Sequence, residues 1–365
     1  MNKIDRYKKS IEFDPKDVDA WINLADAYFE VENYQKTIKC YEKALALNVN
    51  PYSYDDVWNN LGLAYSYLDN YDKAIECYKR SIELFPDDAI CMYNIGYAYE
   101  DKGEEFNNKA IEWYMKALEI EPGYTEALHS IASIYRDQEN YDKAIRFYKR
   151  AVKINPDDTY LLKNLAVAYC EKKDYENAIL YYKKALEIDP NDPEIWDELG
   201  NAYFELYEYK EAIKNYEKGV ELDPEDYEIW NNIALSYYYL NEYEKSIMYY
   251  KNALRLEPDD YILYYNIGYS YLRLLKYDKA IKYFEKSLEL NPEYYATLKN
   301  LGIAFQAKKN FEKAKHYYKK AKDLENLDIE LWTNLSTCYT QMNKLEKAEK
   351  CKKEALRIDE LYEDL

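Results

Sequence analysis

Histidine is nearly absent from this chain of 365 residues, and its scarcity removes most enzymatic chemistry. Only His129 and His316 occur, and they lie far apart in the sequence. A nucleophilic triad needs a histidine beside a nucleophile, and a catalytic zinc centre needs several histidines at fixed spacing. We therefore expect a protein that is not an enzyme, with no catalytic residues, no metal site and no cofactor.

Cysteine is also sparse, with six residues that form no CxxC pair. Three of the six (Cys40, Cys77 and Cys351) occupy equivalent places in a repeating pattern described below. This spacing argues against a disulfide framework and against a zinc ribbon. We expect partly buried, reduced thiols of an intracellular protein.

Long apolar runs and an excess of positive charge are missing as well. No stretch of 18 apolar residues occurs, and the N-terminal sequence MNKIDRYKKSIEF has no apolar core of a signal peptide. The formal net charge of −19 disfavours nucleic acid and anionic membrane surfaces as partners, since both attract basic proteins. The expected location is therefore the cytoplasm, in soluble form.

What the chain does contain is a period of 34 residues. Trp196 and Trp230 are 34 residues apart, and aromatic residues recur in the same frame. The clearest of these series are Tyr135, Tyr169, Tyr203, Tyr237, Tyr271 and Phe305, and Tyr148, Tyr182, Tyr216, Tyr250, Phe284 and Tyr318. A period of this length indicates stacked structural repeats rather than a globular enzyme.

Each repeat is predicted to be a helical hairpin. In the repeat that begins at Pro193, Trp196, Leu199, Gly200 and Tyr203 follow the i, i+3, i+4, i+7 spacing of one helical face. A second apolar stripe begins at Tyr209, and an Asp-Pro pair ends it. Ten such repeats are predicted over residues 18–358, starting at residues 18, 55, 89, 125, 159, 193, 227, 261, 295 and 329.

The ends and two insertions depart from this pattern. Residues 1–17 match only the second helix of a repeat, so they are either a solubilising cap or a sign that the chain is part of a longer protein. Residues 359–365 are expected to form a short frayed tail. Three extra residues fall within 48–54 between repeats, and two within 103–109 at the turn inside the third repeat.

Acidic residues cluster before each predicted first helix, as in Asp157–Asp158 and Asp223–Asp226. The clusters lack the glycine and the spacing of a calcium-binding loop. Carboxylates at these places are typical helix caps, because they accept hydrogen bonds from unpaired backbone N–H groups.

The pattern W-x-x-L-G-x-x-Y, then Y-x-x-A-I-x-x-Y-x-x-A-L and a terminal proline, resembles the tetratricopeptide repeat (TPR) over about Val18 to Glu360. The resemblance implies an all-α fold, an α-solenoid in which stacked helical hairpins form a right-handed superhelix. In that family, positions 2, 5, 6, 9, 12 and 13 of each repeat line a concave, peptide-binding groove. The pentatricopeptide repeat, which reads RNA, is disfavoured by the acidic charge and the strict 34-residue period.

Position 6 of the repeat is asparagine in eight of ten repeats, although asparagine is a poor helix former. A carboxamide matches the N–H and C=O of a peptide unit, so such a column can hold an extended backbone. It is similar to the asparagine ladder in the TPR arm of O-linked N-acetylglucosamine transferase. Alternatively, the amides bond neighbouring helices. The column consists of Asn23, Asn60, Asn94, Asn164, Asn232, Asn266, Asn300 and Asn334.

The other groove positions are expected to select the ligand. Acidic residues such as Asp197 and Glu198 occupy the first half of the chain and its middle, while Tyr238, Tyr265 and Tyr269 follow in repeats 7 and 8. Such a groove would complement an extended segment that is basic toward one end and aromatic or apolar toward the other. The alternative is that the acidic surface only keeps a long solenoid soluble.

One familiar TPR function is disfavoured by the residues present. TPR domains that bind the C-terminal tails of chaperones carry Lys at position 5 with Asn at position 9. Here Lys163 is followed by Val167, and Lys299 by Ile303. No repeat has basic residues at both positions 2 and 6, so binding of a chaperone C-terminal tail is not expected.

Three functions remain open at this point. The first is a scaffold that binds a protein or peptide partner in extended conformation. The second is the substrate-recruiting arm of a larger enzyme such as a glycosyltransferase, which the half repeat at the N-terminus suggests. The third is a structural spacer in a ciliary or cytoskeletal assembly, which would bind no peptide.

Overall fold

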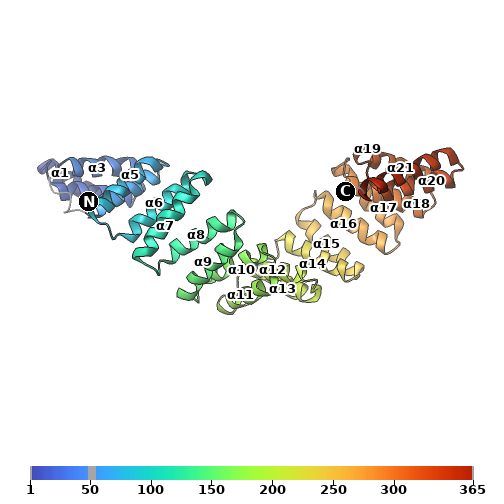
Figure 1. Cartoon of the computed structure of the whole chain (residues 1–365), viewed down its shortest axis with the longest axis horizontal. Helices are drawn as coiled ribbons and strands as arrows, with labels where there is room; N and C mark the ends of the chain where they lie inside the picture. Colours follow the sequence, from blue (N-terminus) through green and yellow to red (C-terminus); the bar gives the residue numbers. More distant parts are fainter. Residues whose placement is uncertain (1, 48–54, 364–365) are drawn as a thin grey trace. The chain divides into compact units, whose positions relative to one another are not determined.

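The computed structural model describes residues 2–47 and 55–363, and within them every regular element is a helix (Figure 1). The chain divides into an N-terminal unit, residues 1–174, and a C-terminal unit, residues 175–365. In each unit, consecutive helices pack as antiparallel hairpins, and each hairpin packs on the next. The all-α solenoid fold predicted from the period is thereby confirmed.

The N-terminal unit begins with a single helix and continues with hairpins. Its helices are α1 (Lys3–Phe13), α2 (Val18–Phe29), α3 (Tyr34–Leu47), α4 (Asp55–Ser66), α5 (Tyr71–Leu84), α6 (Ala89–Lys102), the 3-10 helix η2 (Glu104–Phe106), α7 (Asn107–Ile120), α8 (Thr125–Asp137), α9 (Tyr141–Ile154) and α10 (Thr159–Glu171). The expected three-residue insertion in 48–54 lies outside the described residues. The two-residue insertion forms η2, which connects the helices of the third hairpin.

The C-terminal unit repeats the same hairpin with almost constant helix lengths. Its helices are α11 (Tyr175–Ile188), α12 (Pro193–Glu205), α13 (Tyr209–Leu222), α14 (Tyr227–Tyr239), α15 (Tyr243–Leu256), α16 (Tyr261–Arg273), α17 (Tyr277–Leu290), α18 (Tyr295–Ala307), α19 (Phe311–Leu324), α20 (Ile329–Gln341) and α21 (Leu345–Glu363). The last helix α21 continues through most of the expected tail to Glu363, and Ile358, which precedes the tail, is completely buried.

One aromatic series supplies the centre of the core. Tyr41, Tyr78, Tyr114, Tyr148, Tyr182, Tyr216, Tyr250, Phe284 and Tyr318, all at position 24 of their repeats, are fully buried. Position 8 of the first helix lies against these rings and is small in every repeat. At Gly200, for example, an added Cβ would lie 2.4 Å from a ring carbon of Tyr216. Close helix approach therefore requires the small residue that the sequence repeats at this position.

Two further repeated features join one hairpin to the next. Trp196 and Trp230 donate hydrogen bonds from Nε1 to the carbonyls of Pro190 and Pro224, at 2.9 and 3.0 Å. Aspartate N-caps precede most first helices, and the expected capping role is confirmed, for example, at Asp158 and Asp226. The acidic clusters and the prolines thus serve helix ends and packing.

The turn inside each hairpin contains a residue with positive φ. This residue is Gly103 in the third repeat and a residue other than glycine in the other nine repeats. Glu32, Asp69, Glu139, Lys173, Tyr207, Asn241, Leu275, Lys309 and Asn343 have φ between 56° and 63°. This conformation costs an L-residue about 1–2 kcal/mol, and it suits glycine and asparagine best.

Replacing Leu275 by glycine is therefore expected to stabilise the C-terminal unit. Leu275 has φ 58° and is 68% exposed, so little packing is lost. The relief of backbone strain exceeds the added flexibility of the unfolded chain, for a net gain of about 0.5–1 kcal/mol in chemical denaturation. Asn343→Gly is the matched control, because asparagine already tolerates φ 59°. Equal gains in both variants would contradict the strain explanation.

Candidate functional site

The candidate site is the face formed by positions 2, 5, 6, 9, 12 and 13 of the first helices, here called the first-helix face. It is described separately within each unit. The asparagine column runs along this face in both units. Asn23 is exposed, Asn300 is buried with 8% exposure, and the others are half-buried: Asn60, Asn94, Asn164, Asn232, Asn266 and Asn334.

Several asparagines bond to their own helix. Asn23, Asn164 and Asn300 each donate from Nδ2 to the backbone carbonyl four residues earlier, at 2.7–2.8 Å. Such bonds fix the side-chain rotamer of a residue that otherwise competes with helix formation. These three amides are thus held in place by bonds within their own helices.

Others bridge to position 5 of the preceding repeat. Asn94 donates to Oδ1 of Asn59 at 2.9 Å, and Asn300 donates to the hydroxyl of Tyr265 at 3.3 Å. Asn232 lies 3.4 Å from Oδ1 of Asp197. The alternative that these amides bond neighbouring helices therefore accounts for part of the column, and for Asn300 most completely.

Asp197 and Glu198 lie together in the sixth repeat. Asp197 accepts hydrogen bonds from Asn201 at 3.2 Å and from Asn232. Burial, aided by the charges of Glu198 and Asp226, raises the pKa of Asp197 to about 6, although the two amides oppose the shift. A half-buried carboxylate that lacks a cationic partner among these contacts is suited to receive a positive charge from outside.

The tyrosines of repeats 7 and 8 form one cluster. Tyr269 stacks on Tyr238 with ring centroids 5.6 Å apart and on Tyr265 at 5.8 Å. The guanidinium of Arg273 donates to the Tyr238 hydroxyl at 3.0 Å and lies 5.2 Å from the ring centroid of Tyr243. Sequence reasoning missed Arg273, which adds a positive charge at position 13 beside these rings.

Part of the acidic lining has a structural use that the sequence pattern did not reveal. The buried position-24 hydroxyls need acceptors, and first-helix residues supply them. Tyr114 donates to Glu100 at 2.5 Å, Tyr216 to Asn201 at 2.8 Å, and Tyr41 to Asp26. Acidic residues at positions 9 and 12 therefore satisfy core tyrosines as well as facing outward.

The first-helix face of the N-terminal unit also contains tyrosines that the sequence analysis overlooked. Tyr67, Tyr93 and Tyr97 line a cavity of about 390 Å³ together with Asn94 of the column. Tyr67 and Tyr97 are 59% and 46% exposed. The sequence could have identified these tyrosines, because they occupy positions 13, 5 and 9 of repeats 2 and 3, which belong to the first-helix face.

The two histidines lie in different surroundings. His129, at position 5 of the fourth repeat, packs against Tyr160 and Tyr148 with centroids 5.0 and 5.7 Å apart. Burial and the charge of Arg136 lower its pKa. His316 is exposed on α19 and packs edge-on against Tyr317.

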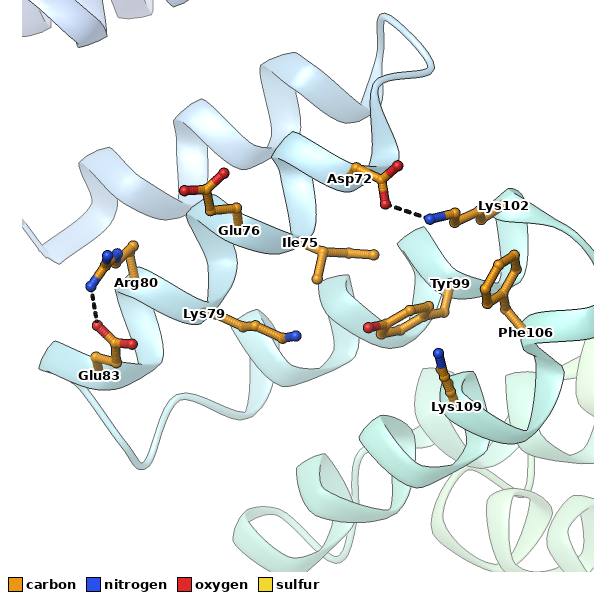
Figure 2. A pocket seen from close by; sticks show the side chains of 10 residues that line it. All are labelled: Asp72, Ile75, Glu76, Lys79, Arg80, Glu83, Tyr99, Lys102, Phe106 and Lys109. Atoms are coloured by element: carbon orange, nitrogen blue, oxygen red, sulfur yellow. Dashed lines mark hydrogen bonds and ion pairs between the residues drawn. The ribbon is translucent and has the colours of Figure 1, made fainter.

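A second kind of cavity, of about 500 Å³, lies between α5, α6, η2 and α7, away from the first-helix face. Figure 2 shows Ile75, Tyr99 and Phe106 in its lining, with Lys79 and Lys109 directed toward Tyr99. Lys102 pairs with Asp72, and Arg80 pairs with Glu83 at 2.8 Å (Figure 2). Four of the seven charged side chains in this lining therefore pair with one another, and both signs of charge are present.

The described residues also bear on metal binding and on membrane crossing. Across residues 2–47 and 55–363, no group of three or more His, Cys, Asp or Glu side chains is arranged to hold a metal ion. In the same part of the chain, no helix combines the length and apolar character needed to cross a membrane. Five of the six cysteines are buried in the helix packing, and Cys170 is half-buried.

Three solved structures illustrate how the chain compares with known folds. The C-terminal part of a TPR repeat-containing protein from Cytophaga hutchinsonii matches with a TM-score of 0.61 and 22% identity, over 67% of this chain and 99% of that one. MamA protein gives 0.45 and 28%, over 46% and 92%. Yeast Tom70 gives 0.42 and 17%, over 93% and 92%. No curated protein matches the sequence.

Family models cover nearly the whole repeat region. Models described as tetratricopeptide repeat match residues 17–87, 54–122, 125–158, 147–179, 227–260, 261–294, 298–326 and 329–360. A model described as TPR repeat matches residues 166–206 and 200–239. The helical hairpins, the buried position-24 rings and these matches agree, and the chain belongs to the tetratricopeptide repeat family.

Proposed function

We propose that the chain is a non-enzymatic interaction scaffold that binds an extended peptide along its first-helix face. The observation that carries this proposal is the asparagine column, in which seven of eight side chains are at least partly exposed. Hydrogen bonds within the chain hold several of these amides, and each bond uses one of the two Nδ2 hydrogens. Groups already held in place lose little entropy when a ligand binds.

Charge supports a basic partner. The net charge of −19 favours a peptide with cationic residues, and so does Asp197, whose carboxylate is bonded by two amides and by no cation among the described residues. The Tyr238, Tyr265 and Tyr269 cluster suits an apolar or aromatic side chain. The same charge disfavours nucleic acid and anionic membranes as ligands. The absence of a repeat with basic residues at both positions 2 and 6 disfavours the C-terminal tails of chaperones. We place this role in the cytoplasm.

Removing amides from the column tests the proposal. In the triple variant N232A/N266A/N334A, affinity for peptides selected from an immobilised library is expected to fall at least about tenfold, because three backbone contacts are lost. Asn300 is excluded, because it is buried and bonded within the chain. Fluorescence anisotropy with the selected peptides measures the loss, and circular dichroism checks that the fold is retained.

The control is Asn252→Ala, which removes an amide from the second helix α15. Its affinity is expected to match that of the original chain. If the triple variant binds the selected peptides as tightly as the original chain does, the asparagine column is not part of the binding site. A library in which no peptide binds would favour a structural spacer instead.

A further inference from the structure

Two carboxylates flank the tyrosine cavity of the N-terminal unit. Asp69 lies in the turn between α4 and α5, and Asp101 lies at position 13 of α6. Both line the cavity with Tyr67 and Tyr97. Burial and the charge of Asp69 raise the pKa of Asp101, and the charge of Asp101 raises the pKa of Tyr97. The two acids therefore repel each other within one concave site.

Other acids at the junctions between repeats are neutralised by the chain itself. Lysines on one hairpin pair with acids on the preceding hairpin in Lys102–Asp72, Lys172–Asp142, Lys276–Glu244, Lys308–Asp278 and Lys344–Glu312. Among the described residues, Asp69 accepts a hydrogen bond from the Tyr71 hydroxyl at 2.9 Å, and neither Asp69 nor Asp101 pairs with a cation. The cavity lacks the cation that the repeat supplies at neighbouring places.

The aromatic rings are fixed and accessible. Tyr67 stacks on Tyr34 with centroids 4.6 Å apart and an interplanar angle of 7°, and it remains 59% exposed. Tyr97 lies 6.4 Å from Tyr93, which packs in turn against Tyr114 at 5.2 Å. Rings held by their neighbours can receive a cation on the open face at little entropic cost.

We propose that Tyr67, Tyr97, Asp69 and Asp101 form a subsite for an arginine side chain of the bound peptide. A guanidinium stacks flat on tyrosine and donates to two carboxylates at once, which a lysine ammonium does less well. Asn94 of the asparagine column lines the same cavity, so the arginine subsite would adjoin the proposed peptide-binding column. The inference rests on the proposed function, since it assigns one side chain of the same ligand.

A small probe tests the subsite without knowledge of the natural partner. Acetyl-arginine methylamide is titrated into the full chain carrying ¹³C-labelled tyrosine rings, with Tyr67 and Tyr97 assigned through their Tyr→Phe variants. Their resonances are expected to shift with arginine and to remain unchanged with the neutral citrulline analogue. In D69N/D101N the affinity is expected to fall about tenfold, because two charge contacts are lost.

The matched control D87N/D157N makes the same change of net charge at exposed turn positions of the same unit. Its arginine affinity is expected to be unchanged. Asparagine tolerates the φ of 56° at position 69, so D69N/D101N retains the fold. Equal shifts with arginine and citrulline, or an unchanged affinity in D69N/D101N, would overturn the subsite.

The two proposals fail separately. If arginine shifts neither tyrosine resonance but peptide binding depends on Asn232, Asn266 and Asn334, the proposed groove stands and the arginine subsite is wrong. If arginine shifts both tyrosine resonances but the N232A/N266A/N334A variant binds peptides normally, the arginine subsite stands and the asparagine column is not the peptide-binding element.

Discussion

Gly200→Val is expected to lower the free energy of unfolding of the C-terminal unit by about 2–3 kcal/mol. A Cβ at residue 200 would lie 2.4 Å from one ring carbon of Tyr216 and 2.5 Å from another. Tyr216 is almost completely buried and bonds Asn201, so its ring cannot swing away without losing packing. A single Cβ at residue 200 already requires the Tyr216 ring to shift, and valine adds two further methyl groups beside it.

Gly200→Ala separates overpacking from backbone effects. Alanine occupies the same position in the next repeat, where Ala234 and Tyr250 are both buried. A ring placed slightly differently therefore accommodates one methyl group. Because alanine also improves helix propensity by about 1 kcal/mol, the net change for Gly200→Ala is expected to be small.

The matched control is Gly123→Ala in the turn between α7 and α8, where an added Cβ meets nothing within 4 Å. Its stability is expected to equal or slightly exceed that of the original chain. Urea denaturation measures the change, and hydrogen exchange locates it to α12 and α13. A Gly200→Val variant as stable as Gly123→Ala would show that helix separation at position 8 is not limiting.

The hairpins and the core could be predicted because they depend on spacing alone. Apolar residues at i, i+3, i+4 and i+7 must share a helical face, and a fixed period makes every repeat bury the same positions. Tyr148, Tyr182 and Tyr216 were found as a series in the sequence, and all three are fully buried. The proline and aspartate positions followed from equally local rules for helix ends.

The polar face could be predicted only in outline. Whether an amide faces a ligand or a neighbour depends on the residue about 35 positions earlier, as for Asn300 with Tyr265 and Asn94 with Asn59. The acid Glu100 serves a buried tyrosine, which a charge pattern cannot distinguish from a role in binding. The sequence pattern likewise did not show that α21 continues to Glu363, because the repeat ends before these residues.

Asp197→Asn is expected to stabilise the C-terminal unit by about 2 kcal/mol at pH 7.5. Burial raises the pKa of Asp197 from 3.8 to about 6, with help from the charges of Glu198 and Asp226. Above pH 6 the folded chain must hold this carboxylate ionised in a partly desolvated site. Asparagine keeps an oxygen for the amides of Asn201 and Asn232 and removes the charge.

The sign of the pH dependence follows from proton binding. Between about pH 4 and pH 6, the folded chain retains a proton on Asp197 that the unfolded chain has released. The stability of the original chain should therefore fall as pH rises through this window and stay level above it. The advantage of Asp197→Asn should vanish near pH 4, where the carboxyl is protonated in both states.

Urea titrations from pH 4 to pH 8 measure this difference. Asp259→Asn, at an exposed turn position of the same unit, is the control and should show no comparable gain. A constant difference between Asp197→Asn and the original chain at all pH values would mean that Asp197 titrates normally.

A carboxylate that costs stability when ionised can return that free energy to a cationic ligand. If the proposed peptide places a positive charge beside Asp197, it lowers the pKa of that carboxyl and binding releases a proton near pH 6. The affinity for the peptide should then rise between about pH 5 and pH 7. The release of one proton allows a rise of at most about tenfold for each pH unit. Asp197→Asn should abolish that rise while making the free protein more stable. A variant that gains stability and keeps the full pH dependence of binding would show that Asp197 is not the group that titrates on binding.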